Sequence, residues 1–182
     1  ERAVARVQAA IRDREAILLY GDYDVDGTSA IVILKSALDL LGAQTEFFVP
    51  HRLKDGYGMK GERIAEAARE GVRLVISVDT GIRAGEVVKL ASSLGMDVIV
   101  TDHHLPEAEI PPAAAVVNPN QPGCRYPNKG LCGAGVAFQL ARALFARSGW
   151  DESRQRKLTE SLVKLAALAT VADIVPLLGE SR

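Results

Sequence analysis

The chain has 182 residues, of which 48% are hydrophobic and 25% are charged, and its formal net charge is −1. This length and composition predict one domain over residues 1–182, and the near-neutral charge excludes binding of nucleic acid by bulk positive charge. The apolar runs are too short to span a bilayer and no signal peptide opens the chain, so we expect a cytoplasmic protein with no membrane partner.

Short apolar runs alternate along the chain with amphipathic stretches of helical length. In chain order, the pattern predicts an opening helix that carries Val4 and Val7, then strands over 16–20, 45–49, 74–78, 98–101 and 114–117. Helices are predicted over 28–41, 61–70, 84–94, 135–147 and 152–172, with a long loop over 118–133. Such alternation is typical of a doubly wound α/β fold, in which a mainly parallel sheet of about five strands is flanked by helices.

Three carboxylates follow the first predicted strand, at Asp22, Asp24 and Asp26. Like charges at this density repel one another, and a bound cation would turn that repulsion into coordination. In open α/β sheets, ligands bind beyond the carboxyl ends of the strands. We therefore interpret this turn as part of a metal site.

Three further polar clusters end or interrupt buried elements. Asp79 follows the third strand, Asp102, His103 and His104 follow the fourth, and Asp173 lies within the apolar run of the last helix. Each has a structural alternative, namely a helix cap, a buried structural histidine or a salt bridge. A shared pair of cations explains the clusters together, which these alternatives do not.

The candidate ligands are carboxylate oxygens and imidazole nitrogens. This combination suits Mn²⁺ or Mg²⁺ better than structural zinc, and we read Cys124 and Cys132 as ordinary thiols, in neither a disulfide nor a zinc site. Five or more ligands exceed what one ion usually takes from a protein while it leaves room for water and substrate, so we expect two ions that share a carboxylate. Ion pairs of this kind, about 3.5–4 Å apart, support in-line displacement at phosphorus.

Two different interpretations of the first motif remain. The spacing of its acidic residues matches the start of an EF-hand loop, but Ile33 stands where that loop requires a glutamate. The motif also resembles that of haloacid-dehalogenase phosphatases, in which Asp24 would be the nucleophile and Asp26 the general acid. That interpretation leaves residues 102–104 without a role.

The motifs together resemble those of the DHH family of phosphoesterases. Residues 22–27, 77–81 and 102–104 resemble its first three motifs, and Asp173 its fourth. Segments 56–58, 117–119, 130–138 and 172–177 are most similar to the branch of single-strand-specific DNA exonucleases. The resemblance implies an enzyme that uses Mn²⁺ or Mg²⁺, two ions per site, to release mononucleotides from the 5′ end of single-stranded DNA in repair and recombination.

The same resemblance implies roles for individual residues. The implied metal ligands are Asp24, Asp26, Asp79, His103 and Asp173, with Asp79 as the bridge. His104 and Asp102 are the implied catalytic residues, with His104 as a phosphate contact, an acid or a further ligand.

Tyr20 departs from the family pattern, because some relatives have a histidine at its position. We expect Asp22 to take the place of that histidine as a ligand or to support the other ligands.

Two segments are candidates for binding nucleic acid. Arg52 and Lys54 would bind phosphates and Tyr57 would stack on a base, although an ordinary solvated loop has the same composition. The amides of Gly133 and Gly135 could approach a phosphate at a helix N-terminus, while tight helix packing also requires small residues.

The resemblance also sets expectations for the whole protein. Residues 1–182 would be a catalytic piece of a longer protein, without the second, substrate-binding domain of the family. We expect a monomer that acts on single-stranded DNA, with a single-strand-binding protein or a helicase as a further partner. The alternatives are a related phosphodiesterase or pyrophosphatase for short oligonucleotides or small nucleotides, and a nonenzymatic replication scaffold.

Overall fold

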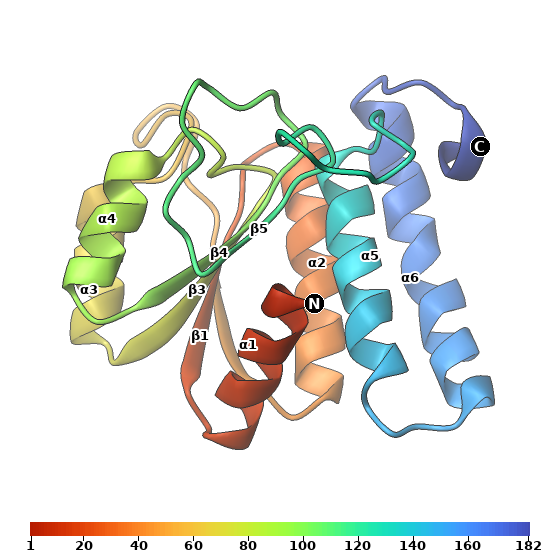
Figure 1. Ribbon diagram of the computed structural model, residues 1–182, viewed down its shortest axis with the longest axis horizontal. Helices are drawn as coiled ribbons and strands as arrows, with labels where there is room; N and C mark the ends of the chain where they lie inside the picture. The colour runs from red at the N-terminus through yellow and green to blue at the C-terminus, as the bar shows by residue number, and fades with distance from the viewer.

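A computed structural model describes residues 1–182 as a five-stranded sheet with helices on both faces (Figure 1). The strands are β1 Ala16–Tyr20, β2 Gln44–Phe48, β3 Val72–Val78, β4 Asp97–Thr101 and β5 Ala115–Val117. The helices are α1 Arg2–Arg12, α2 Val25–Leu40, α3 Gly61–Arg69, α4 Gly85–Ser93, α5 Gly133–Ala146 and α6 Glu152–Ala172, followed by a 3₁₀ turn, Gly179–Ser181. None of the helices combines the length and hydrophobicity needed to cross a membrane.

The strand order is β2-β1-β3-β4-β5, and every neighbouring pair is parallel. The predicted doubly wound α/β fold is therefore confirmed. Strand β2 lies beside β1 at one edge of the sheet, and the chain then returns to form β3 on the opposite flank of β1. In such folds ligands bind at the carboxyl ends of the strands, in the crevice where the strand order reverses, which here lies between β1 and β3.

Alternating strand residues build a separate core on each face of the sheet. In β1, Ile17 and Leu19 belong to a cluster of 28 buried residues shared with α1, α2, α5 and α6. Leu18 and Tyr20 belong to a cluster of 13 buried residues shared with α3 and α4. Because successive side chains of a strand point to opposite faces, one short strand supports both cores and is held firmly in place.

Helix α2 begins at Val25, three residues before the predicted start at residue 28. The reason is a cap, because the carboxylate of Asp24 accepts a hydrogen bond from the Gly27 amide at 2.9 Å. The earlier start places Asp26 in the first turn of the helix, where its side chain is buried.

Two further helix ends, the start of α5 and the end of α6, contribute to the same edge of the sheet. Helix α5 begins at Gly133 and not at Gly135, because Cys132 occupies the cap position and its sulfur accepts from the Gly135 amide at 3.4 Å. Helix α6 ends at Ala172, as predicted, and Asp173 is its C-cap residue. Both of these helix ends point toward the carboxyl edge of the sheet.

Candidate metal centre

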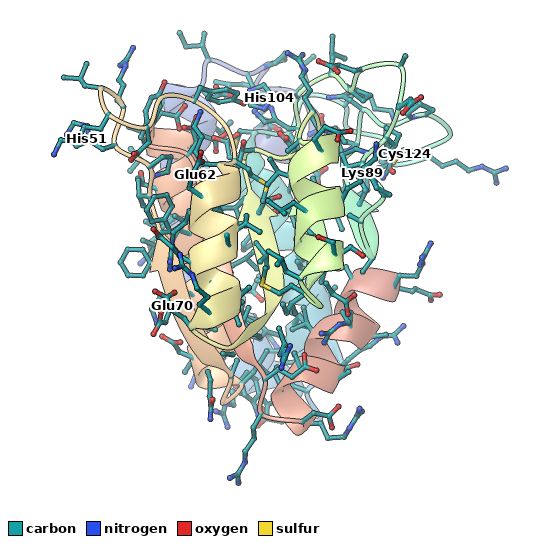
Figure 2. All side chains as sticks on the ribbon, turned by 90° about the vertical axis from the view of Figure 1, so that its left-hand side faces the viewer. His51, Glu62, Glu70, Lys89, His104 and Cys124 are labelled. Atoms are coloured by element: carbon teal, nitrogen blue, oxygen red, sulfur yellow. The ribbon has the colours of Figure 1, made fainter.

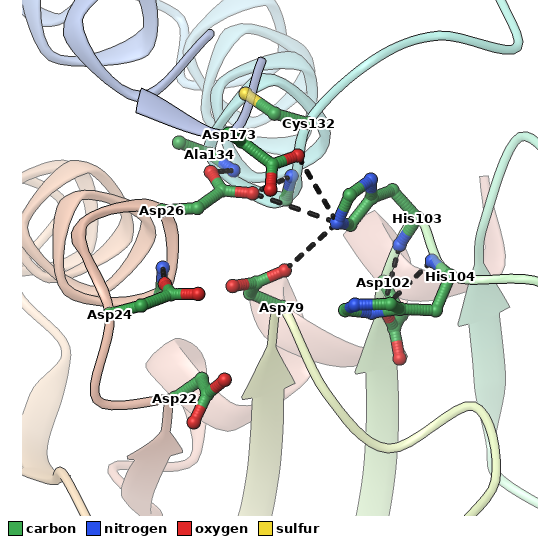
Figure 3. A network of polar contacts seen from close by, with 12 residues as sticks. Asp22, Asp24, Asp26, Asp79, Asp102, His103, His104, Cys132, Ala134 and Asp173 are labelled. Carbon is green, nitrogen blue, oxygen red and sulfur yellow. Dashed lines mark hydrogen bonds and ion pairs between the residues drawn. The ribbon is translucent and has the colours of Figure 1, made fainter. Parts of the chain in front are cut away.

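Six of the predicted ligands meet at the carboxyl edge of the sheet (Figure 3). They come from the turn after β1, the first turn of α2, the ends of β3 and β4, and the end of α6: Asp22, Asp24, Asp26, Asp79, His103 and Asp173. The structure thus brings together carboxylates that are up to 151 residues apart in sequence, from Asp22 to Asp173.

The imidazole of His103 lies at the centre of this cluster. Its Nε2 atom is 3.2 Å from Asp79 Oδ1, 3.7 Å from Asp26 Oδ2 and 3.8 Å from Asp173 Oδ2. Three carboxylates around one ring nitrogen form a site that a cation would satisfy better than a single proton does.

Three groups of side chains have ligand atoms within 4.8 Å of one another. They are Asp22, Asp24 and Asp79; Asp26, His103 and Asp173; and Asp79, His103 and His104. Asp79 belongs to two of the groups. It therefore lies between the aspartates that follow β1 and the histidines that follow β4.

Asp79 is the least satisfied carboxylate of the cluster. Its residue is 1% exposed, and its Oδ1 atom is buried without a hydrogen-bond partner. Burial, followed by the nearby charges of Asp26 and Asp24, raises the pKa of Asp79 to about 10. Its backbone has a φ of 58°, a left-handed conformation that aspartate adopts more readily than most residues.

These features fit divalent cations. A buried carboxylate without a partner is costly unless a positive charge compensates it. The surrounding donors are oxygens and imidazole nitrogens, the ligand types that Mn²⁺ accepts and of which Mg²⁺ takes the oxygens. The chain can thus hold cations at this edge with its own side chains.

The raised pKa of Asp79 predicts that cation binding depends on pH. Below its folded-state pKa of about 10, the metal-free site holds a proton that a cation must displace. Mn²⁺ affinity should therefore increase with pH across the neutral range, by up to about tenfold per pH unit for each proton released. Titration calorimetry in buffers of different ionisation enthalpy would count those protons. An affinity independent of pH would contradict the prediction.

The N-terminus of α5 holds Asp26. Its Oδ2 accepts from the Gly133 amide at 2.6 Å, and its Oδ1 accepts from the Ala134 amide at 2.7 Å. Two amides at a positive helix end bind a carboxylate in the way that they would bind any anion. The expected contact of Gly133 and Gly135 with a phosphate therefore differs from what is found, because these amides donate to Asp26 and to Cys132.

Asp102 is buried and accepts four hydrogen bonds. Its Oδ1 accepts from the amides of His103 and His104, at 2.7 and 3.1 Å, and lies 2.7 Å from His104 Nδ1. Its Oδ2 accepts from the Ile82 amide at 2.9 Å. Because both of its oxygens are engaged by donors of the chain itself, these contacts favour a role for Asp102 in positioning His104 over the predicted catalytic role.

The Asp102 contact also controls the charge of His104. This hydrogen bond raises the pKa of His104, although burial acts in the opposite direction. Burial alone would raise the pKa of Asp102, but its hydrogen bonds with His104 and Ile82 outweigh it and lower that pKa. Because Nδ1 is engaged, Nε2 is the nitrogen of His104 that is free to face a phosphate.

We expect Asp102→Asn to lower the pKa of His104. Asparagine keeps the shape of the side chain but removes the negative charge that stabilises the imidazolium. The pKa can be followed by NMR from the ring protons of His104 in the metal-free protein. As a control, Asp97→Asn alters a carboxylate that pairs with Arg6 and should leave the titration unchanged. An unchanged His104 titration in Asp102→Asn would contradict the assignment.

Two asparagines for which no role was predicted hold the backbone of the two histidines. Asn118 Nδ2 donates to the carbonyl of His104 at 2.9 Å, and Asn120 Nδ2 donates to the carbonyl of His103 at 2.6 Å. Both belong to the predicted long loop, directly after β5. The signal available in the sequence was an Asn-Pro-Asn run at a strand end, a composition typical of a structured turn.

Two of the three residues predicted to bind nucleic acid, Arg52 and Tyr57, lie close to residues of the site, and the third, Lys54, does not. The guanidinium of Arg52 lies over the ring of Tyr23, 5.4 Å from its centroid, which brings a cation beside the turn that follows β1. The ring of Tyr57 meets His104 edge-on, with centroids 6.1 Å apart. Lys54 is exposed, and the structure records no contact between its side chain and the cluster.

Tyr20 does not take part in the cluster. Its hydroxyl accepts from the Lys60 amide at 3.1 Å and donates to the Gly58 carbonyl at 3.4 Å. It therefore fixes the segment that carries Tyr57. The position that some relatives fill with histidine thus has a structural role here, and Asp22 is the nearby carboxylate that groups with Asp24 and Asp79.

Comparison with known proteins agrees with this geometry. Residues 16–170 match the DHH family, N-terminal domain. The chain is 44% identical over 182 residues to the single-stranded-DNA-specific exonuclease RecJ of Bacillus subtilis, and 42% identical over 188 residues to that of Escherichia coli. It spans all of its own length in both matches but only 22% and 33% of those relatives. A crystal structure of exonuclease RecJ bound to manganese superposes with a TM-score of 0.88 at 39% identity, over 99% of this chain and 44% of that one.

Proposed function

The chain belongs to the DHH family, and from this premise we propose that it is the catalytic part of a metal-dependent exonuclease. Its substrate would be single-stranded DNA, from which it releases mononucleotides at the 5′ end. The observation that carries the proposal is the convergence of five aspartates and a histidine at one sheet edge, in a chain 44% identical to a RecJ exonuclease. We propose Mn²⁺ or Mg²⁺ as the cofactor, because the donors fit either and the matched RecJ structure is bound to manganese.

In this proposal the aspartates and His103 would hold two cations, and Asp79, which belongs to two of the groups of ligands, would serve as a shared ligand. The bound cations would stabilise the charge that develops on phosphate oxygens during hydrolysis. The protein's own contribution is to keep its ligands fixed: the α5 amides hold Asp26, and Asp102 holds His104. His104, with its Nε2 free, would donate a hydrogen bond to the phosphate that is cleaved.

The test compares three substrates with the complete protein and Mn²⁺. Single-stranded DNA, duplex DNA and a dinucleotide, each labelled at one end, are incubated side by side. The expected result is release of mononucleotides from the 5′ end of the single strand. Activity confined to the dinucleotide would instead indicate a phosphodiesterase for short oligonucleotides or small nucleotides.

A nonenzymatic scaffold and a haloacid-dehalogenase phosphatase would each behave differently in this experiment. The scaffold would bind DNA without cleaving any of the three substrates. The haloacid-dehalogenase interpretation of Asp24 is not supported, since the chain belongs to the DHH family and His103 lies among the carboxylates. A phospho-aspartyl intermediate on Asp24 would contradict the present proposal.

A further inference from the structure

A cavity of about 540 Å³ lies beside the candidate metal centre. It is bounded by the segment around Tyr57, by the start of α4 and by the loop over 105–112, and its wall includes Asp102 and His104. Figure 2 shows His104 at the end of the molecule where α3 and α4 begin. The volume of the cavity lies within the range of about 300–1,000 Å³ that is usual for small-molecule sites.

We propose that this cavity holds the nucleoside of the terminal nucleotide, the unit that is released. The inference rests on the proposed function, because it places the substrate relative to the same centre. His104 forms part of the wall and is the residue whose free nitrogen would face the phosphate. A nucleoside in the cavity is therefore attached to the phosphate that His104 contacts.

The cavity wall suits the flat faces of a base and a sugar. Its apolar surface includes Met59, Ile82 and Ile110, and Tyr57 is an aromatic residue that is half exposed at its edge. Aromatic and apolar side chains bind bases by stacking, without a requirement for one sequence. Space is available, since a Cβ atom added to Gly85 would meet nothing within 4 Å.

The charges around the cavity disfavour a strand that continues through it. Glu107 and Glu109 line the cavity and form no ion pair. The two cations of the wall are engaged, since Arg83 donates to the Leu105 carbonyl and Lys89 pairs with Glu86. A DNA strand that continued through the cavity would bring several phosphates near the carboxylates of Glu107 and Glu109, whereas a terminal nucleotide brings at most its own 5′ phosphate. The cavity therefore fits the end of a strand.

The first arm of the test fills the cavity. Gly85→Trp places an indole in the open space at the start of α4, and Ser92→Trp adds the same side chain at an exposed position near the end of that helix. In the complete protein with Mn²⁺, Gly85→Trp should raise the KM for an oligodeoxynucleotide by about 10-fold to 100-fold. This is the loss of affinity expected when the stacking of one base is removed. Hydrolysis of methyl p-nitrophenyl phosphate, a diester with no nucleoside, and the Kd for Mn²⁺ should change less than about twofold. Ser92→Trp should match the wild type in all three measurements.

The second arm uses the wild-type protein and is independent of any variant. An oligodeoxynucleotide carries 5-iodouracil at its 5′-terminal position or at its fourth position, with a phosphorothioate at the first linkage to slow cleavage. Irradiation followed by peptide mapping should link the terminal base, and not the fourth, to Tyr57, Met59 or His104. Crosslinks of the terminal base outside the cavity wall, or of the fourth base to it, would overturn the inference.

The outcomes separate this inference from the proposed function. If the wild type releases no nucleotide from DNA, the proposed function fails. If the wild type is active but Gly85→Trp has an unchanged KM, the cavity does not hold the nucleoside. If Gly85→Trp also loses hydrolysis of methyl p-nitrophenyl phosphate, the substitution has disturbed the metal centre itself. The residue that is crosslinked in the wild type then decides whether the cavity holds the terminal nucleoside.

Discussion

Asp79→Asn is expected to remove Mn²⁺ binding and nucleotide release together, with a loss of rate of about 1,000-fold. Asparagine has nearly the same shape but cannot supply the negative charge that two groups of candidate ligands share. The magnitude is the upper range seen when one preorganised group that stabilises developing charge is removed. Calorimetric titration with Mn²⁺ and an assay on end-labelled single-stranded DNA would measure the two effects in the complete protein.

The same substitution should raise the stability of the metal-free protein. The pKa of Asp79 is raised in the folded state from the ordinary value of 3.8, so the folded state keeps a proton that the unfolded state releases at neutral pH. For an acid with a raised folded pKa, this difference destabilises the fold above about pH 4, and increasingly so as pH rises. Asparagine removes that cost, and the melting temperature at pH 7 should increase.

The control for Asp79→Asn is Asp13→Asn, which changes an exposed carboxylate at the end of α1. It should leave Mn²⁺ binding and activity unchanged. If Asp79→Asn bound Mn²⁺ like the wild type, the assignment of Asp79 as the shared ligand would be wrong. A lower melting temperature of the metal-free variant would show that the Asp79 carboxylate stabilises the fold and is not an unsatisfied ligand.

Gly133→Ala is expected to weaken Mn²⁺ binding by about 10-fold to 100-fold, although residue 133 supplies no ligand atom. A Cβ atom there would lie 2.5 Å from Asp79 Oδ1 and 2.6 Å from Asp79 Cβ. Relief requires either the Asp79 side chain or α5 to move. The first displaces a candidate ligand, and the second takes the amides of Gly133 and Ala134 from Asp26. The magnitude is that of substitutions which disturb the groups that orient metal ligands.

The control is Gly130→Ala, three residues earlier in the same segment. Its added Cβ atom would meet Pro176 Cδ at 3.4 Å, an ordinary contact. Mn²⁺ titration of both variants, with circular dichroism to confirm that each is folded, separates the positioning of Asp26 from a general effect on the loop. A folded Gly133→Ala variant with wild-type Mn²⁺ affinity would contradict the role assigned to the α5 terminus.

Local sequence patterns predicted most of the helices and strands, because the periodicity of apolar residues follows from which face of each element is buried. The alternation in β1 and the helical spacing in α2 follow from which face of each element is buried, and this periodicity is written in the sequence. The boundaries differed where caps intervened. Asp24 starts α2 three residues early by accepting from the Gly27 amide, a choice that the apolar pattern does not reveal.

The roles of the site residues were less accessible from the sequence. Asp102 lies in the same motif as His103 and His104, but only its burial and its four donors identify it as a positioning residue. Gly133 and Gly135 indicated an anion site, and the anion at Gly133 is the protein's own Asp26, 107 residues away. No local pattern specifies such a partner.

The sequence alone therefore determined the α/β class, the carboxylates and histidines at strand ends, and the resemblance to the DHH family. The tertiary structure decided which of these groups meet. The order β2-β1-β3-β4-β5 makes β1 and β3 neighbours and brings Asp22, Asp24 and Asp26 next to Asp79. Packing of α5 and α6 on the same face of the sheet adds the amides that hold Asp26 and the carboxylate of Asp173. The physical reason is that burial and turn chemistry act over a few residues, whereas contacts at a site depend on the strand order and packing of the whole chain.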